Sequence, residues 1–310
     1  MVGSAVPLVS SDEALKQLQQ TITIRVRENV AGSDLTTFSI GGAIRYLVEP
    51  QSEAELIAVL RVLSFFDLPY RVIGAGSNLL IPDAGIEGWV IRLGRGFRYY
   101  RAAGDSSFEV GAAMSYMTLS RDLSEKGFSG LEFAGGIPAS AGGAVRMNAG
   151  AHGGETAEVI QSVRFLLRSG ERQELGIRNL RFAYRSSDLP ADAIVTSITI
   201  SLVHSSKEKT EGLRQQFLDH RRRYQPLSLC SAGSVFRNPD PTQTAGRVIE
   251  AAGLRGRQIG GAKISELHGN WIVNPEKRAR SEDVEALIAL CVNTVREQRD
   301  IVLEPELIRW

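Results

Sequence analysis

Apolar residues recur with the period of a helix at several places in the chain. Ser52 and Glu55 have the spacing of a capping box, and the apolar residues that follow them share one helix face: Leu56, Ile57, Leu60 and Leu63. In the last third, three more helices are predicted at 213–224, at 244–252 before Gly253, and at 281–299. Cys291 lies on the apolar face of the last one, which predicts a core position.

Other segments have the pattern of strands. YRVI at 70–73 predicts a strand that leads into a glycine-containing turn. Apolar residues alternate with polar or small ones from 194 to 202, which predicts a half-buried strand. The polar segment 205–212 separates this mixed region from the helical last third. We therefore expect an α+β protein with a domain boundary near residue 205.

Composition excludes several classes of function. The 310 residues have a net charge of +1, which argues against a nucleic-acid-binding surface. The two cysteines, Cys230 and Cys291, are far apart, so neither a zinc site nor a disulfide framework is predicted, and we expect no metal. The first residues lack the pattern of a signal peptide, and no apolar run is long enough to cross a membrane. We expect a cytoplasmic protein, and a monomer.

Two glycine-rich segments are the most unusual feature. FAGGIPASAGGAVRMNAGAHGG occupies 133–154, and GAGSNLL occupies 74–80. Exposed backbone N–H groups in such segments are typical of sites for a nucleotide diphosphate. Neither is a standard motif, because position 79 is Leu79 where a Rossmann loop needs glycine, and Ala144 stands where a Walker loop needs lysine. Tight turns and close packing of the chain are the alternative reading for each segment alone.

Seven segments, in order, resemble those of the UDP-N-acetylenolpyruvoylglucosamine reductase family, which makes UDP-N-acetylmuramate for peptidoglycan. They are TTFSIGG at 36–42, GAGSNLL at 74–80, GIPASAGGAVRMNAGAHG at 136–153, AYRSSDL at 183–189, SAGSVFRNP at 231–239, AGRVIEAAGLRGRQIGGAKISELHGNWIVN at 245–274, and LEPE at 303–306. The similarity extends over nearly the whole chain after residue 35. Each motif alone would be weak evidence, but their shared order makes coincidence a poor explanation.

The resemblance implies an α+β fold with a two-part FAD-binding domain of the vanillyl-alcohol-oxidase-like type and a smaller α+β substrate-binding domain. The implied division is an N-terminal helical lead-in at 1–35, the FAD-binding domain at 36–205 and the substrate-binding domain at 206–310. The residues expected to bind FAD are Gly74, Ala75, Gly76, Ser77, Asn78, Leu79, Ala134, Gly135, Gly136, Ile137, Pro138, Ser140, Gly142, Gly143, Ala144, Asn148, Ala149 and Gly150.

The resemblance also implies the reaction. FAD, reduced by NADPH, supplies a hydride to the enolpyruvyl group of UDP-N-acetylglucosamine enolpyruvate. Ser234 matches the family's proton donor, Arg185 the arginine that pairs with the substrate carboxylate, and Glu306 a second acid. Outside this motif, Ser234 would be read as a turn serine, Arg185 as a surface charge and Glu306 as a solvated carboxylate.

Further residues of the matching segments are expected to hold the sugar nucleotide. They are Tyr184, Asn238, Lys263 and His268, with Arg221, Arg222, Arg223 and Arg237 as candidates for contacts with the diphosphate. The run of charges in HRRRY is also typical of a solvated helix face. His268 has no metal-ligand spacing around it, which favours a hydrogen-bonding role.

The sequence departs from the family pattern at three places. Ala139 replaces a glycine, which requires a negative φ at that residue. Most members have arginine two residues after the last glutamate, where this chain has Ile308, followed by Arg309. Cys230 stands where a proline is usual, close to Ser234. Whether Arg309 replaces the family arginine is therefore a question for the structure.

Two other functions were weighed. A flavin oxidase or dehydrogenase of the same fold would act on a small alcohol or hydroxy acid, but alcohol oxidation needs a base rather than the proton donor that Ser234 provides. A non-catalytic protein that binds a nucleotide sugar would have the same segments without turnover. The reductase function agrees best with Ser234, Arg185 and Glu306 together.

Overall fold

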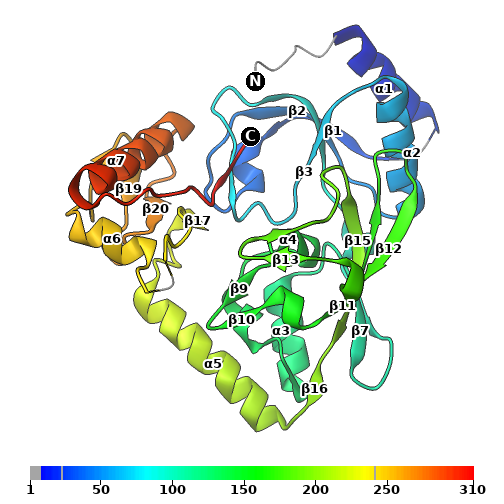
Figure 1. The fold of residues 1–310 in the computed structure, drawn as a ribbon. Helices are drawn as coiled ribbons and strands as arrows, with labels where there is room; N and C mark the ends of the chain where they lie inside the picture. Colours follow the sequence, from blue (N-terminus) through cyan, green and yellow to red (C-terminus); the bar gives the residue numbers. More distant parts are fainter. Residues whose placement is uncertain (1–7, 22–23, 241) are drawn as a thin grey trace. The chain divides into compact units, whose positions relative to one another are not determined.

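The computed structural model describes residues 8–21, 24–240 and 242–310 (Figure 1). Two compact units are present. Unit 1 comprises Met1–Glu28, Arg45–Ala75 and Glu87–Asp219, and unit 2 comprises Asn29–Ile44, Gly76–Ile86 and His220–Trp310. The units interleave along the chain, whereas the domains predicted at 1–35, 36–205 and 206–310 follow one another, so that division stays a prediction.

The first sheet has the strand order β1-β2-β5-β3 and is accompanied by two helices. Its elements are α1 (Leu8–Thr21), β1 (Val26–Ala31), β2 (Ala43–Val48), α2 (Glu53–Phe65), β3 (Tyr70–Val72) and β5 (Ile86–Ile91). The predicted helix start is confirmed, because the Ser52 hydroxyl accepts the N–H of Glu55 at 3.2 Å. Leu56, Leu60 and Leu63 are fully buried, as the apolar face of α2 requires.

Unit 1 also contains an antiparallel five-stranded sheet of order β12-β11-β15-β7-β6. Its strands are β6 (Tyr100–Ala102), β7 (Ser107–Gly111), β11 (Ile160–Leu166), β12 (Arg172–Gly176) and β15 (Ile194–Ser201). Helices α3 (Tyr116–Glu125) and α4 (Ala141–Arg146) belong to the same unit, and α4 contacts β15. Short pairs complete the unit: β8 (Phe128–Ser129) with β16 (Val203–His204), β9 (Gly150–Ala151) with β10 (Gly154–Glu155), and β13 (Phe182–Ala183) with β14 (Ser186–Ser187).

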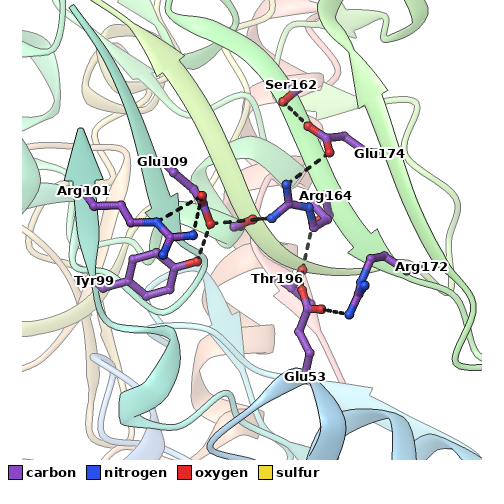
Figure 2. A network of polar contacts seen from close by, with 10 residues as sticks. Glu53, Tyr99, Arg101, Glu109, Ser162, Arg164, Arg172, Glu174 and Thr196 are labelled. Carbon is purple, nitrogen blue, oxygen red and sulfur yellow. Dashed lines mark hydrogen bonds and ion pairs between the residues drawn. The ribbon is translucent and has the colours of Figure 1, made fainter. Parts of the chain in front are cut away.

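The strand predicted at 194–202 exists as β15, but it is buried on both faces rather than on one. Thr196 and Ser197 are 1% and 3% exposed, although they occupy adjacent positions whose side chains point to opposite faces. The Thr196 hydroxyl donates to Glu53 Oε1 at 2.8 Å, and Arg164 Nη1 donates to the Ser197 hydroxyl at 3.4 Å (Figure 2). The alternation of apolar and polar residues predicted one buried face only. It did not indicate the burial of these hydroxyls, because polar side chains rather than apolar ones cover them.

Unit 2 contains an antiparallel sheet of order β17-β20-β19-β18. Its elements are β17 (Cys230–Ser234), α6 (Ala245–Ala251), β18 (Gln258–Ile259), β19 (Ala262–Ile264), β20 (Trp271–Asn274) and α7 (Ser281–Arg299), with β4 (Leu79–Leu80) paired in parallel to β21 (Ile308–Arg309). Helix α7 contacts β18 and β19. Cys291 is 1% exposed, and this burial raises the pKa of its thiol to about 12, which confirms the predicted core position.

Helix α5 (Lys207–Tyr224) begins six residues before the predicted start at 213, so most of the polar segment 205–212 is helical. The Ser206 hydroxyl accepts the N–H of Lys209, and the buried Thr210 hydroxyl donates to the carbonyl of Ser124 in α3 at 2.6 Å. Polar contacts rather than an apolar face stabilise this first turn. None of the described helices is both long and apolar enough to cross a lipid bilayer.

Candidate active site

The two glycine-rich segments meet in unit 1. A Cβ atom placed on Gly74, just after β3, would lie 2.5 Å from the hydroxyl oxygen of Ser140, which caps α4. Gly74 thus permits the loop after β3 to approach the start of α4. Gly74 and Ala75 are exposed, and Gly136 and Ile137 are half-buried. Accessible main chain flanked by small side chains is what a nucleotide diphosphate requires, so these residues fit FAD.

The residues at the start of helix α4 have local structural roles. The Ser140 hydroxyl accepts the N–H of Gly143 at 3.3 Å, and the backbone at Ser140 is extended. Ala139 is not among the described residues with positive φ, so its backbone tolerates a side chain as the sequence required. Gly142 packs closely on Ala112 and Val195. Part of the glycine content of this segment therefore serves packing of the chain on itself.

Asn148, after α4, is completely buried and has a φ of +41°. Its Oδ1 accepts the N–H of Ala157 at 3.0 Å, and its Nδ2 donates to the carbonyl of Ala183 at 3.2 Å. This amide therefore ties the end of the glycine-rich segment to β13. The Asn148 side chain thus has a structural role. Its role in FAD binding stays a prediction.

Tyr184 and Arg185 form the turn between β13 and β14 in unit 1. The backbone of Arg185 has a φ of +57°, and its guanidinium carbon lies 5.0 Å from the centre of the Tyr184 ring. The hydroxyl of Ser187 donates to the carbonyl of Arg146, the last residue of α4, at 3.0 Å. The turn that carries Arg185 is thus attached to the glycine-rich segment from both strands.

In unit 2, Ser234 ends β17 and lies opposite Trp271 of β20, after a register shift. Gly233, just before it, has a φ of +79°, and a Cβ atom there would meet nothing within 4 Å. Open space therefore borders the serine. The indole Nε1 of Trp271 is buried without a hydrogen-bond partner in the described part of the chain. A bound acceptor next to Ser234 would satisfy such a donor.

The main chain of Glu306 lies beside Val235, the residue after Ser234, within the same unit. Its N–H donates to the carbonyl of Val235 at 2.8 Å, and Pro305 forms a β-bridge with Phe236. Asn78 donates from Nδ2 to the carbonyl of Glu306 at 3.1 Å. We call this arrangement of segments 76–79, 234–236 and 305–308 the Asn78–Glu306 junction. It brings together four predicted FAD-binding residues, Gly76, Ser77, Asn78 and Leu79, and two predicted catalytic residues, Ser234 and Glu306.

Thr37 was not among the predicted site residues, yet it connects two parts of the site. Its N–H donates to the carbonyl of Gly76 at 3.1 Å, its hydroxyl donates to the carbonyl of Ser231 at 2.7 Å, and its own carbonyl accepts the N–H of Ser231 at 3.1 Å. The only signal in the sequence was its place in TTFSIGG, which gave no separate role. Thr37 links the loop after β3 to the strand that carries Ser234.

Arg309 has a partner in α7. Its guanidinium pairs with Glu285 at 3.2 Å, and the two side chains are partly exposed. Ile308, just before it, is 42% exposed. Arg309 therefore forms an ion pair at the surface of unit 2.

The residues predicted to hold the sugar nucleotide are in two places. In unit 1, Tyr184 is 47% exposed. In unit 2, Asn238 Oδ1 accepts the N–H of Ala245 at the start of α6, and Lys263 pairs with Glu266. Burial lowers the pKa of His268, and its Nδ1 accepts the N–H of Asn270 at 3.1 Å. A neutral His268 with Nδ1 as acceptor carries its proton on Nε2, where it is a donor.

A cavity of about 740 Å³ lies on the sheet of unit 2. Lys263 and Val273, which are opposite each other in β19 and β20, line it together with Gln258, Pro226 and Leu229. Its volume lies in the range of small-molecule sites.

Among the candidate arginines, Arg221 is 8% exposed, and burial lowers its pKa to about 10. The Arg237 N–H donates to the carbonyl of Glu304 at 2.9 Å.

Residues 30–176 match the model of an FAD binding domain, and residues 225–310 match the model described as the UDP-N-acetylenolpyruvoylglucosamine reductase C-terminal domain. UDP-N-acetylenolpyruvoylglucosamine reductases of Bacillus velezensis and Bacillus subtilis are each 40% identical to this chain over 298 residues, which cover 96% of this chain and 97% of theirs. The chain belongs to the UDP-N-acetylenolpyruvoylglucosamine reductase family.

A solved structure agrees with this assignment. The crystal structure of the Thermus caldophilus UDP-N-acetylenolpyruvylglucosamine reductase superimposes with a TM-score of 0.81 at 37% identity, covering 93% of this chain and 99% of that one. The resemblance stated from the motifs and the predicted α+β fold class are confirmed. The chain is an FAD-dependent oxidoreductase of this reductase family, and the matched FAD binding domain includes both glycine-rich segments.

Proposed function

We propose that this reductase-family member converts UDP-N-acetylglucosamine enolpyruvate to UDP-N-acetylmuramate, with FAD as cofactor and NADPH as reductant. Family membership over 96% of the chain and the match to an FAD binding domain support the proposal. The observation that carries it within the structure is the 2.8 Å hydrogen bond from the N–H of Glu306 to the carbonyl of Val235. It holds the main chain of the predicted acid against Val235, the residue that follows the predicted proton donor, Ser234.

The reaction adds a hydride to the terminal carbon of the enolpyruvyl group and a proton to the carbon that bears the carboxylate. When bound, FAD would supply the hydride-transfer chemistry between NADPH and the substrate. Ser234 donates the proton from its hydroxyl. A serine hydroxyl is a weak acid, so it must be held at the acceptor carbon, and its place at the end of β17, next to the open space at Gly233, supports that role.

Arg185 stabilises the negative charge on the substrate carboxylate, and Glu306 acts on the intermediate. Hydride addition increases the charge on the substrate carboxylate, and the planar guanidinium of Arg185 can donate two hydrogen bonds to both oxygens. Its turn is fixed through Ser187 and Arg146, which supports a positioned rather than a mobile arginine. Glu306 positions or protonates the intermediate beside Ser234.

The cavity on the sheet of unit 2 is our candidate for part of the nucleotide-sugar site. Lys263 lines it, and Asn238 and His268 belong to the same unit. A neutral His268 offers an N–H to a ligand oxygen without a change of charge, and Lys263 can exchange Glu266 for a phosphate oxygen. We further propose a cytoplasmic monomer that acts in peptidoglycan precursor synthesis, and thereby in cell-wall biogenesis, cell shape and cell division.

Anaerobic stoichiometry tests the function. The purified protein, supplied with FAD, NADPH and UDP-N-acetylglucosamine enolpyruvate, is expected to consume one NADPH for each product molecule, and the product is heavier than the substrate by two hydrogen atoms in a mass spectrum. Consumption of NADPH only when oxygen is admitted would indicate an oxidase. Binding of the nucleotide sugar without any product would indicate a non-catalytic protein.

A further inference from the structure

Asn78 makes two hydrogen bonds to the main chain of residues 306–308, one to Glu306 and one to Ile308. Its side-chain Nδ2 donates to the carbonyl of Glu306 at 3.1 Å, and its own carbonyl accepts the N–H of Ile308 at 3.2 Å. The two bonds therefore enclose Leu307, which is buried. Residues 78 and 306 are 228 positions apart in the sequence, so this contact closes a long part of the chain.

The orientation of the Asn78 amide follows from its partner. A backbone carbonyl oxygen can only accept a hydrogen bond, so the group that faces it must be the Nδ2 donor. If this bond were removed, the carbonyl of Glu306 would lose the partner that the amide provides. The half-buried position of both residues makes such a loss costly.

Glu306 is also held by the segment that follows Ser234. The N–H groups of Glu306 and Leu307 donate to the carbonyl of Val235 at 2.8 Å and 3.3 Å, and the N–H of Arg237 donates to the carbonyl of Glu304 at 2.9 Å. The main chain at Glu306 thus lies between the loop that contains Asn78 and the segment next to Ser234. Its distance from Ser234 depends on both contacts.

We propose that Asn78 is a positioning residue for the acid of the reaction: it fixes the main chain at Glu306, and with it the carboxyl group relative to the Ser234 hydroxyl. This role rests on the proposed function for Ser234 and Glu306. It also couples the loop after β3, which is expected to contact FAD, to the acid. Asn78 acts through Glu306 and is not assigned to the reacting atoms.

The kinetic test compares Asn78→Ala with Arg309→Met in the FAD-loaded enzyme. Both substitutions remove a side-chain contact of the C-terminal segment, but the contact of Arg309 is with Glu285 of α7 and not with Glu306. We expect Asn78→Ala to slow reoxidation of the reduced flavin by the enolpyruvyl substrate about tenfold or more, because small misplacements reduce rates strongly. Flavin reduction by NADPH should change less than about twofold, and kcat should fall with little change in KM.

The pH profile of reoxidation gives a signature that a purely structural loss would not. In Asn78→Ala the dependence of the reoxidation rate on pH should differ from that of the wild type, since the carboxyl group of Glu306 has new surroundings, whereas Arg309→Met should keep the wild-type profile. Reoxidation at the wild-type rate and with the wild-type profile in Asn78→Ala would overturn the proposal.

Hydrogen exchange tests the proposal without turnover. In Asn78→Ala, the amides of residues 306–308 should exchange faster than in the wild type, and in Arg309→Met they should not. This comparison is made on the apo proteins if Asn78→Ala fails to retain FAD. Unchanged exchange at 306–308 would overturn the proposal even if the reductase function holds. A wild-type enzyme whose reduced flavin is not reoxidised by the enolpyruvyl substrate would refute the proposed reductase function instead. The exchange rates at 306–308 would still test the contact between Asn78 and Glu306.

Discussion

The outer face of the five-stranded sheet and the Asn78–Glu306 junction both connect residues that are distant in the sequence, but their chemistry differs. On the sheet, Glu109 accepts from the Tyr99 hydroxyl and from Arg101, each at 2.8 Å, and Arg164 lies 3.6 Å away (Figure 2). At the junction, neutral main-chain bonds and one amide hold Glu306. In the sheet network, Glu109 keeps two partners when one is removed. At the junction, the carbonyl of Glu306 accepts a hydrogen bond from the Asn78 amide, and removal of that amide removes the bond.

This difference predicts where substitutions matter. In the network, a lost partner leaves others in place and water close by, so the effect on stability is small and has little influence on the reaction. At the junction and at the residues assigned to the reaction, each group has a separate role. A single substitution there should impair one step of turnover while the protein remains folded.

The largest effect is expected for Ser234→Ala. Reoxidation of the reduced flavin by the enolpyruvyl substrate should slow by about 10³-fold or more, because the proton donor is lost. NADPH-driven flavin reduction should continue at the wild-type rate, since Ser234 has no part in it. Anaerobic stopped-flow absorbance measures both half-reactions, and loss of both together would contradict a proton-donor role.

Arg185→Lys should have the next largest effect. An ammonium group keeps the charge but cannot provide the planar fork of two N–H donors to a carboxylate, so reoxidation should slow by about tenfold to a hundredfold. The same stopped-flow assay measures this rate. The control is Arg178→Lys, which makes the same substitution at an exposed residue of unit 1. Arg146→Lys is not suitable, because Arg146 contacts the strand pair that carries Arg185. Unchanged reoxidation in Arg185→Lys would remove Arg185 from the site.

Glu109→Gln should affect stability alone. Burial raises the pKa of Glu109, but hydrogen bonds from Arg101 and Tyr99 and the nearby charges lower it overall. A lowered pKa in the folded state gives stability that is present above the unfolded pKa and is lost as pH falls through the folded pKa. At pH 7 the variant should therefore lose about 1 kcal/mol or less, and the difference from wild type should vanish in acid.

Denaturant unfolding from pH 7 down to pH 3 measures that difference, with Glu28→Gln, an exposed carboxylate on β1, as the control. A gap between Glu109→Gln and wild type that stays constant through the acid range would show that the carboxylate charge is not the cause.

Tyr99 gives the opposite pH dependence. Burial, with the hydrogen bond to Glu109, raises the pKa of its phenol to about 12. A raised pKa gives stability that is fully present below the unfolded pKa, near 10, and is lost as pH rises through about 12. Tyr99→Phe should therefore flatten the fall in the unfolding free energy between pH 10 and pH 12. An equally steep fall in the variant would contradict this assignment.

The smallest effect is expected for Arg101→Met. The Arg101 side chain is 68% exposed, and Glu109 keeps Tyr99 and Arg164 as partners. The free energy of unfolding should change by less than about 0.5 kcal/mol, and both half-reactions should keep their wild-type rates. A larger loss of stability would show that the network acts as one cooperative group.

Local patterns predicted much of the fold. The capped start of α2, strand β3, and helices α6 and α7 all follow from capping residues and apolar spacing, which act over one or two turns of chain. The start of α5 was missed because Thr210 and Ser124, which are 86 residues apart, make the contact that holds it. The burial of Thr196 was missed for the same kind of reason, since Glu53 lies 143 residues away.

The candidate site residues were named from motifs, but the contacts between them were not predicted. Ser234, Glu306 and Asn78 were all named in this way, yet no local pattern indicated that the Asn78 amide bonds to the carbonyl of Glu306. Thr37 was overlooked because its role consists of contacts with Gly76 and Ser231, which only the folded chain supplies. The ion pair of Arg309 with Glu285 of α7 was not indicated by any local pattern either.

An anaerobic absorption spectrum of the purified protein, recorded before and after NADPH and then after UDP-N-acetylglucosamine enolpyruvate, tests the central claim most directly. We expect an oxidised-flavin spectrum that bleaches with NADPH and returns with the enolpyruvyl substrate in the absence of oxygen. Recovery of the flavin colour only when oxygen is admitted, or a protein that takes up no FAD, would contradict the account.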